Sequence, residues 1–286
     1  ILALVIFYAL TKSRSGKLIF LAAAGLSFVH LALAWLPLLI AAIVTVTEKA
    51  VRGSWEVKKK LAVPAGLLIG WLARPNFISA IKLAYIQVVQ LVLEKFKDTP
   101  LRFGTELRPG NSLSVVTHEI VPIALLVMAA VVVLVFILKK GPTHQLEKHQ
   151  AVAIYGSLAV SLVFGLLTYG VARRAADIWV GFSLLFVGLV FSVILKKHAD
   201  FYARFKTKIA VVATMVFLSL AANTLRFTRV YFKDATPLGT SKESATWLKE
   251  HSAPGEVVFN IPWDNFPMLF FWNQHNYYVN GMDPIF

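Results

Sequence analysis

Long apolar runs without charge constrain this chain more than any other feature. They occupy residues 18–47, 61–73, 120–138, 151–172, 178–195 and 209–225. Several approach the ~20 residues that an α-helix needs to cross the hydrocarbon core of a bilayer. Lipid offers no hydrogen-bonding partner to the backbone, so such runs must fold as helices. The sequence therefore predicts an α-helical polytopic membrane protein.

The composition agrees with lipid as the main solvent. Hydrophobic residues make up 57% of the chain and charged residues 15%, with a mean hydropathy of +0.68. A soluble domain is roughly half apolar and a quarter charged. The net charge of +14 would suggest nucleic acid for a soluble protein, but the basic residues gather in short loops, so no nucleic-acid partner is expected. The absence of cysteine excludes disulfides, a thiol nucleophile and Cys metal ligands.

Lysine and arginine predict the orientation of the helices. Four short loops hold 16 of the 29 basic residues, at 11–17, 48–60, 139–149 and 196–208. Such loops are typically cytoplasmic. The connection 74–118, the turn 171–177 and everything after residue 225 would then face the other side.

This orientation requires residues 18–47 to enter and leave the membrane on one side. As a single helix these residues would extend ~45 Å, against a core of ~30 Å. A hairpin turning near Trp35-Leu36-Pro37 is therefore favoured over one long tilted helix. The opening run 1–10 is too short to span, and we expect it to be the second half of a helix in a chain that is a fragment.

The remaining segments complete the predicted organisation. Polar residues recur along one face of 78–96, which predicts an amphipathic helix at the non-cytoplasmic interface within the loop 74–118. We therefore expect a transmembrane domain over 1–225. Residues 226–286 are expected to form the start of a small soluble α/β domain, truncated at its end. Its predicted elements are a helix over 240–251 with Thr240 and Glu243 in capping-box spacing, a strand at 256–260, a helix at 266–272 and a strand at 277–279.

No motif of a soluble enzyme occurs, so the candidate site residues are polar groups on the non-cytoplasmic side. Glu106 could orient an acceptor, act as a base or bind a metal, or simply pair with a neighbouring arginine. Arg173 and Arg174 run against the positive-inside bias and could clamp a lipid-linked phosphate; interfacial anchoring is the alternative, as it is for Arg74. Asp264, among aromatic residues, could hold a sugar or an acceptor, or belong to a packing motif.

Three stretches resemble the C-type (GT-C) superfamily of membrane glycosyltransferases and its bacterial relatives. They are WLARPNF at 71–77, GTELRP at 104–109, and ATWLKE at 245–250 continued through PG at 254–255, WDNFP at 263–267 and GMDP at 281–284. The resemblance implies a membrane domain that uses a polyprenyl-phosphate sugar donor at the non-cytoplasmic face, followed by a soluble domain. It also implies residence in a bacterial or archaeal plasma membrane.

The resemblance implies an enzyme that transfers the sugar to an acceptor, with Arg74, Glu106, Arg173, Arg174 and Asp264 as substrate-binding candidates. The family's catalytic acid lies in a first non-cytoplasmic loop that we expect upstream of this fragment, so no catalytic residue is assigned. Membrane lipid and the lipid-linked sugar are the expected partners; no metal ligand is assigned, and a divalent metal stays open. A transporter and a non-catalytic membrane scaffold are the alternatives.

Overall fold

The computed structural model describes residues 1–12, 16–55, 57–97, 109, 123–124, 126–128, 130–131, 147–197, 199–233, 236–260 and 265–279. It divides into two compact units, Ile1–Ala199 and Asp200–Phe286. The structure is mostly helical, as predicted, and a small C-terminal region contains two short parallel strands. The predicted domain boundary at residue 225 falls inside one continuous helix of the second unit, and it remains a prediction.

Four helices of the described chain are long and apolar enough to cross a membrane: Leu31–Arg52, Phe77–Glu94, Lys148–Gly170 and Arg173–Lys196. Large apolar side chains on these and the shorter helices face outward; Leu166 is 75% exposed and Leu21 65%. Small polar side chains such as Ser161 and Ser183 are instead buried between helices. This distribution suits a bundle surrounded by lipid, where small and polar residues mediate helix contacts.

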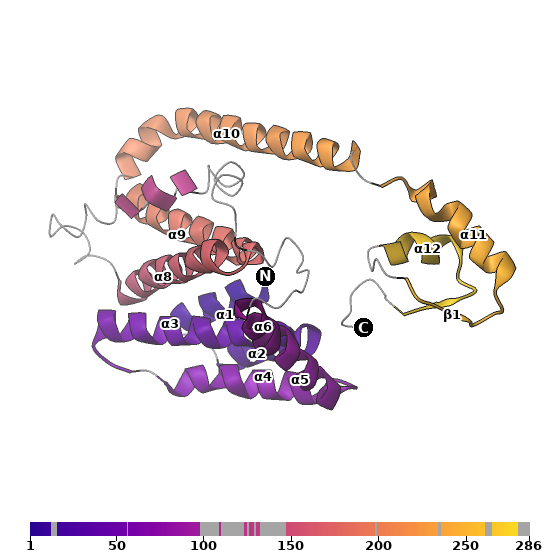
Figure 1. The fold of residues 1–286 in the computed structure, drawn as a ribbon. Coiled ribbons are helices and arrows are strands. Elements are labelled where there is room, and N and C mark those ends of the chain that lie inside the picture. The colour runs from indigo at the N-terminus through magenta and orange to yellow at the C-terminus, as the bar shows by residue number, and fades with distance from the viewer. Residues whose placement is uncertain are drawn as a thin grey trace. The chain divides into compact units, whose positions relative to one another are not determined.

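The first unit is a bundle of short and long helices that pack side by side (Figure 1). Helix α1 (Leu2–Thr11) packs against both α2 (Gly16–Val29) and α3 (Trp35–Arg52). Helix α8 (Lys148–Gly170) packs on α3, and α9 (Ala176–Lys197) packs along α8. The helices around residues 151–172 and 178–195 are thus confirmed, whereas 120–138 lies largely outside the described residues.

The predicted interruption of residues 18–47 is confirmed, but it lies a few residues closer to the N-terminus than predicted. Helix α2 ends at Val29, His30 leaves helical geometry with φ −144° and ψ 81°, and a 3₁₀ turn, η1 (Leu31–Leu33), leads into α3. Pro37 lies in the first turn of α3. A proline is tolerated there because its missing N–H would have no partner in the helix.

Helix α4 (Ala62–Leu72) packs closely along α2 through two glycines one turn apart. A Cβ atom on Gly66 would lie 2.4 Å from the carbonyl oxygen of Phe20, and one on Gly70 would lie 2.1 Å from that of Ala24. Two glycines with three residues between them allow two membrane helices to bring their backbones close together. The apolar run 61–73 predicted the helix, but it did not indicate this close contact with α2.

A buried ion cluster joins the end of α3 to η2 (Lys58–Leu61), the 3₁₀ turn that precedes α4. Glu48 is 3% exposed and Lys60 8%. The Lys60 ammonium donates a hydrogen bond to the Glu48 carboxylate, and Arg52 Nη1 lies 2.8 Å from Glu48 Oε1. Helix α3 ends at Arg52 and is followed by Gly53, whose φ of 77° lies in the left-handed region that favours glycine.

The segment predicted as an amphipathic helix is helical along its length. It consists of α5 (Phe77–Tyr85), the π-helical turn η3 (Ile86–Gln90) and α6 (Leu91–Phe96). No residue of α5 or η3 is buried in the described chain, and Phe77–Glu94 is long and apolar enough to span. Its placement at the interface therefore remains a prediction, and a span is equally compatible with its length.

The second unit begins with helix α10 (Ala199–Lys233), which contains the predicted run 209–225. Its 35 residues extend ~52 Å, well beyond the ~30 Å of a bilayer core. It is followed by η7 (Leu238–Ser241), α11 (Lys242–His251), β1 (Val257–Val258), α12 (Phe266–Trp272) and β2 (Tyr277–Tyr278). Strands β1 and β2 are parallel, with Val257 opposite Tyr277, as in a βαβ unit.

The elements predicted for residues 240–279 are confirmed, with shorter strands, but the capping box is wrong. Thr240 belongs to the 3₁₀ turn η7, and Ser241, which directly precedes α11, makes no side-chain cap. Hydrogen bonds among buried side chains hold this unit together instead. Asn273 Nδ2 donates to Asn276 Oδ1 at 2.6 Å, and Asn276 Nδ2 donates to Ser252 Oγ at 2.7 Å.

Tyr278 adds a polar contact to the same unit. Its hydroxyl donates to the carbonyl oxygen of Asn273 at 3.1 Å. Burial raises the pKa of the Tyr278 hydroxyl above its usual value, because the charged form loses water. The phenol therefore stays neutral and available as a donor through the physiological pH range.

Candidate functional site

The turn between α8 and α9 presents two adjacent arginines. The N–H groups of Val171 and Ala172 both donate to the carbonyl oxygen of Leu167 at 2.9 Å, which closes the end of α8. The 3₁₀ turn η6 (Arg173–Ala175) then leads into α9. Arg173 and Arg174 are exposed, and neither guanidinium has a hydrogen-bond or ion-pair partner among the described residues. As far as the described residues are concerned, both guanidinium groups are therefore available to bind an anionic ligand.

Arg74 has a different environment. Its Nη1 donates to the carbonyl oxygens of Ser27 at 3.3 Å and Phe28 at 2.8 Å. These carbonyls belong to the last turn of α2, where no intrahelical donor is left for them. The positive charge also suits the negative end of the helix dipole. Arg74 thus caps α2, and this contact supplies a structural role for a residue that the sequence analysis nominated for substrate binding.

Arg74 and the arginine turn lie at the same end of the first unit. At the opposite end, a Cβ on Gly16 would lie 4.0 Å from Ala62, so the starts of α2 and α4 meet there and their C-terminal ends lie together. Trp35, at the start of α3, stacks on Phe164, near the end of α8, with the ring centroids 5.8 Å apart. The turn η6 therefore lies at the end that also carries His30 and Arg74.

The structure does not join these arginines into one site. No hydrogen bond or ion pair of the described residues links Arg74 to Arg173 or Arg174. Glu106 and Asp264 lie outside the described residues. In the described ranges, no group of three or more His, Asp and Glu side chains is arranged to hold a metal ion. Among the described residues, the candidate site thus consists of the exposed arginine pair.

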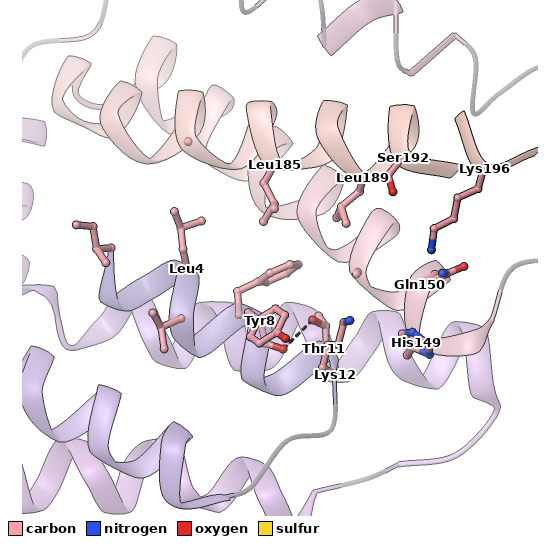
Figure 2. Close-up of a pocket in the computed structure, with 15 residues that line it drawn as sticks. Leu4, Tyr8, Thr11, Lys12, His149, Gln150, Leu185, Leu189, Ser192 and Lys196 are labelled. Atoms are coloured by element: carbon pink, nitrogen blue, oxygen red, sulfur yellow. Dashed lines mark hydrogen bonds between the residues drawn. The ribbon is translucent and has the colours of Figure 1, made fainter. Parts of the chain in front are cut away.

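A groove of about 760 Å³ between α1, α8 and α9 was missed by the sequence analysis. Figure 2 shows apolar side chains such as Leu4, Leu185 and Leu189 along it, and polar side chains at one end. Lys12 and Lys196 lie at the polar end. Both lysines had been interpreted only as cytoplasmic loop charges. Their positions at the ends of two apolar helices were the available signal, but which helices are neighbours depends on tertiary packing.

Comparison of the chain with models of protein families, with curated proteins and with solved structures gave no match. The resemblance to C-type glycosyltransferases therefore remains a prediction from the three sequence stretches quoted above.

Proposed function

We propose that this chain belongs to a membrane enzyme that transfers a sugar from a polyprenyl-phosphate donor to an acceptor on the non-cytoplasmic side. The observation that carries the proposal is the exposed pair Arg173 and Arg174 at the α8–α9 turn. The turn lies opposite the end where Glu48 and Lys60 join α3 to η2. Basic residues are generally depleted from non-cytoplasmic loops, so an arginine pair there calls for an anionic partner.

The chemistry of the guanidinium group supports a phosphate as that partner. Arginine presents a planar fork of donors that binds phosphate oxygens through charge-assisted hydrogen bonds. In the proposed transfer, an acceptor oxygen attacks the anomeric carbon, the bond from that carbon to the phosphate oxygen breaks, and polyprenyl phosphate leaves. Arg173 and Arg174 would stabilise the negative charge that grows on this phosphate. The acceptor proton passes to a base that is not assigned to a described residue.

The alternatives of a transporter and a scaffold have less support. Transporters commonly place charges or broken helices near the middle of the membrane. The buried charges of the described bundle, Glu48 and Lys60, instead belong to the end of α3 and to the turn before α4. A scaffold without a ligand gives no reason for two adjacent arginines that have no ion-pair partner among the described residues.

Binding of a polyprenyl phosphate tests the proposal. The full-length protein would be reconstituted in nanodiscs and titrated with tritiated decaprenyl phosphate. The double variant R173A/R174A is expected to bind at least about 100-fold more weakly, because it removes at least two charge-assisted hydrogen bonds that contribute ~1.5–3 kcal/mol each. The variant K58A/K59A, which removes two exposed lysines from a different turn, is the matched control and is expected to bind normally.

Equal affinities in the wild type and R173A/R174A would reject the arginine pair as the phosphate site and, with it, the proposed function. A second measurement addresses the reaction itself. A polyprenyl-phosphate sugar should release polyprenyl phosphate when acceptor is added to the wild-type protein. R173A/R174A should slow this release by a factor at least as large as its loss of affinity.

A further inference from the structure

We propose that the groove between α1, α8 and α9 binds one anionic phospholipid, with its phosphate at Lys12 and Lys196 and an acyl chain along the apolar walls. The proposal does not rest on the sugar-transfer function. It uses a different surface, at the other end of the bundle from Arg173 and Arg174, and a ligand that undergoes no reaction.

The polar end of the groove is predominantly cationic. Lys12 directly follows α1, Lys196 lies in the last turn of α9, and His149 and Gln150 lie in the first turn of α8. Figure 2 shows the Lys196 side chain extending from α9 toward Gln150, with Lys12 and Thr11 across the groove. One carboxylate is close: Glu147 Oε2 lies 3.1 Å from His149 Nδ1, but its side chain is 68% exposed. The two ammonium groups therefore define the charge that a ligand meets.

The rest of the groove is apolar and has unfilled space. Leu4 and Val5 come from α1, Ala153 from α8, and Leu185 and Leu189 from α9. Gly181 also lines the groove, and a Cβ atom added there would meet no other atom within 4 Å. An amphiphile with an anionic head and a hydrocarbon tail matches this combination of a charged end and an open apolar channel.

Length and position favour a phospholipid of the cytoplasmic leaflet. From Gly181 to Lys196 the groove follows α9 for ~22 Å, which is about half of the ~40–45 Å thickness of a whole bilayer. Lys12 belongs to one of the basic loops that the positive-inside rule places in the cytoplasm. Basic pockets between transmembrane helices on that side are typical sites for anionic headgroups. A single lipid of this leaflet can therefore place its phosphate between the lysines and its chain beside Gly181.

Retention of lipids by the purified full-length protein tests the proposal. The protein would be exchanged into mixed micelles that contain equal amounts of phosphatidylglycerol and phosphatidylcholine, and the lipids that remain bound would be counted by native mass spectrometry. We expect the wild type to retain one phosphatidylglycerol in preference to phosphatidylcholine. The variant K12E/K196E should lower this preference at least about 10-fold, because each basic residue contributes to attraction of an anionic headgroup.

Two further variants separate the groove from general surface charge. A Cβ atom at Gly181 would meet nothing within 4 Å, so Gly181→Leu is expected to extend into the apolar channel and displace the bound lipid while all charges remain. Lys58→Glu changes an exposed lysine that does not line the groove, and it should retain the lipid. Retention by both K12E/K196E and Gly181→Leu would overturn the proposal. Displacement of the lipid by millimolar inorganic phosphate would also overturn it, because the ligand would then be a soluble anion.

Discussion

Gly70→Ala is expected to force α2 and α4 apart and to lower the free energy of unfolding by about 3 kcal/mol, the upper part of the usual range for overpacking. The added Cβ would lie 2.1 Å from the Ala24 carbonyl oxygen and 2.8 Å from the Ala24 Cα. These are backbone atoms of a helix, so they cannot move aside as a flexible side chain can. The loss exceeds the ~1 kcal/mol that alanine gains over glycine in a helix.

A glycine of α9 provides the matched control. Gly188 is also inside a helix, but a Cβ atom there would meet nothing within 4 Å. Gly188→Ala should therefore be neutral or slightly stabilising. Both variants would be unfolded in detergent by titration with a denaturing surfactant and compared with the wild type. Equal stabilities of Gly70→Ala and Gly188→Ala would contradict the close approach of α2 and α4.

Glu48→Ala is expected to cost about 3–5 kcal/mol, because it leaves the Lys60 ammonium buried without its carboxylate. Lys60 is 8% exposed, and Arg52 Nη1 would lose its partner at 2.8 Å as well. The cluster holds the end of α3 against the turn before α4. We therefore expect limited proteolysis of Glu48→Ala to cut between these helices much faster than in the wild type.

Two comparisons decide whether the burial of this pair is responsible. The double variant E48A/K60A removes both charges, so it should recover a substantial part of the stability lost in Glu48→Ala. Lys97→Ala breaks an ion pair with Glu94 whose lysine is 65% exposed, and it should cost less than about 1 kcal/mol. A cost for Glu48→Ala as small as that for Lys97→Ala would show that the cluster is solvated.

Much of the fold could be predicted from the sequence because hydropathy acts locally. Uncharged runs must be helical in lipid, and charges or breakers end them, so α8 and α9 begin and end within a few residues of their predicted limits. The break before α3 was also predictable, because a single 30-residue helix of ~45 Å would be longer than the bilayer core of ~30 Å is thick. Its position was missed by a few residues because Pro37 is tolerated in the first turn of a helix.

Features that depend on which helices are neighbours could not be predicted. Gly66 and Gly70 gain their role only when α4 packs against α2, and Arg74 caps a helix that ends 45 residues earlier in the chain. The groove likewise requires α1, α8 and α9 to meet. Of the five candidate site residues, the structure describes Arg74, Arg173 and Arg174; the last two remain candidates for substrate binding, and the roles of Glu106 and Asp264 remain predictions.

The chain has helices long and apolar enough to cross a bilayer, and we propose that the end that carries Lys58 lies in the cytoplasm and the arginine turn outside. Because the chain contains no cysteine, single cysteines can be labelled without background. Arg174→Cys in the full-length protein should react with a membrane-impermeant maleimide in intact cells, whereas Lys58→Cys should react only after the cells are permeabilised. Labelling of both positions in intact cells, or of neither before permeabilisation, would place them on one side and contradict the account.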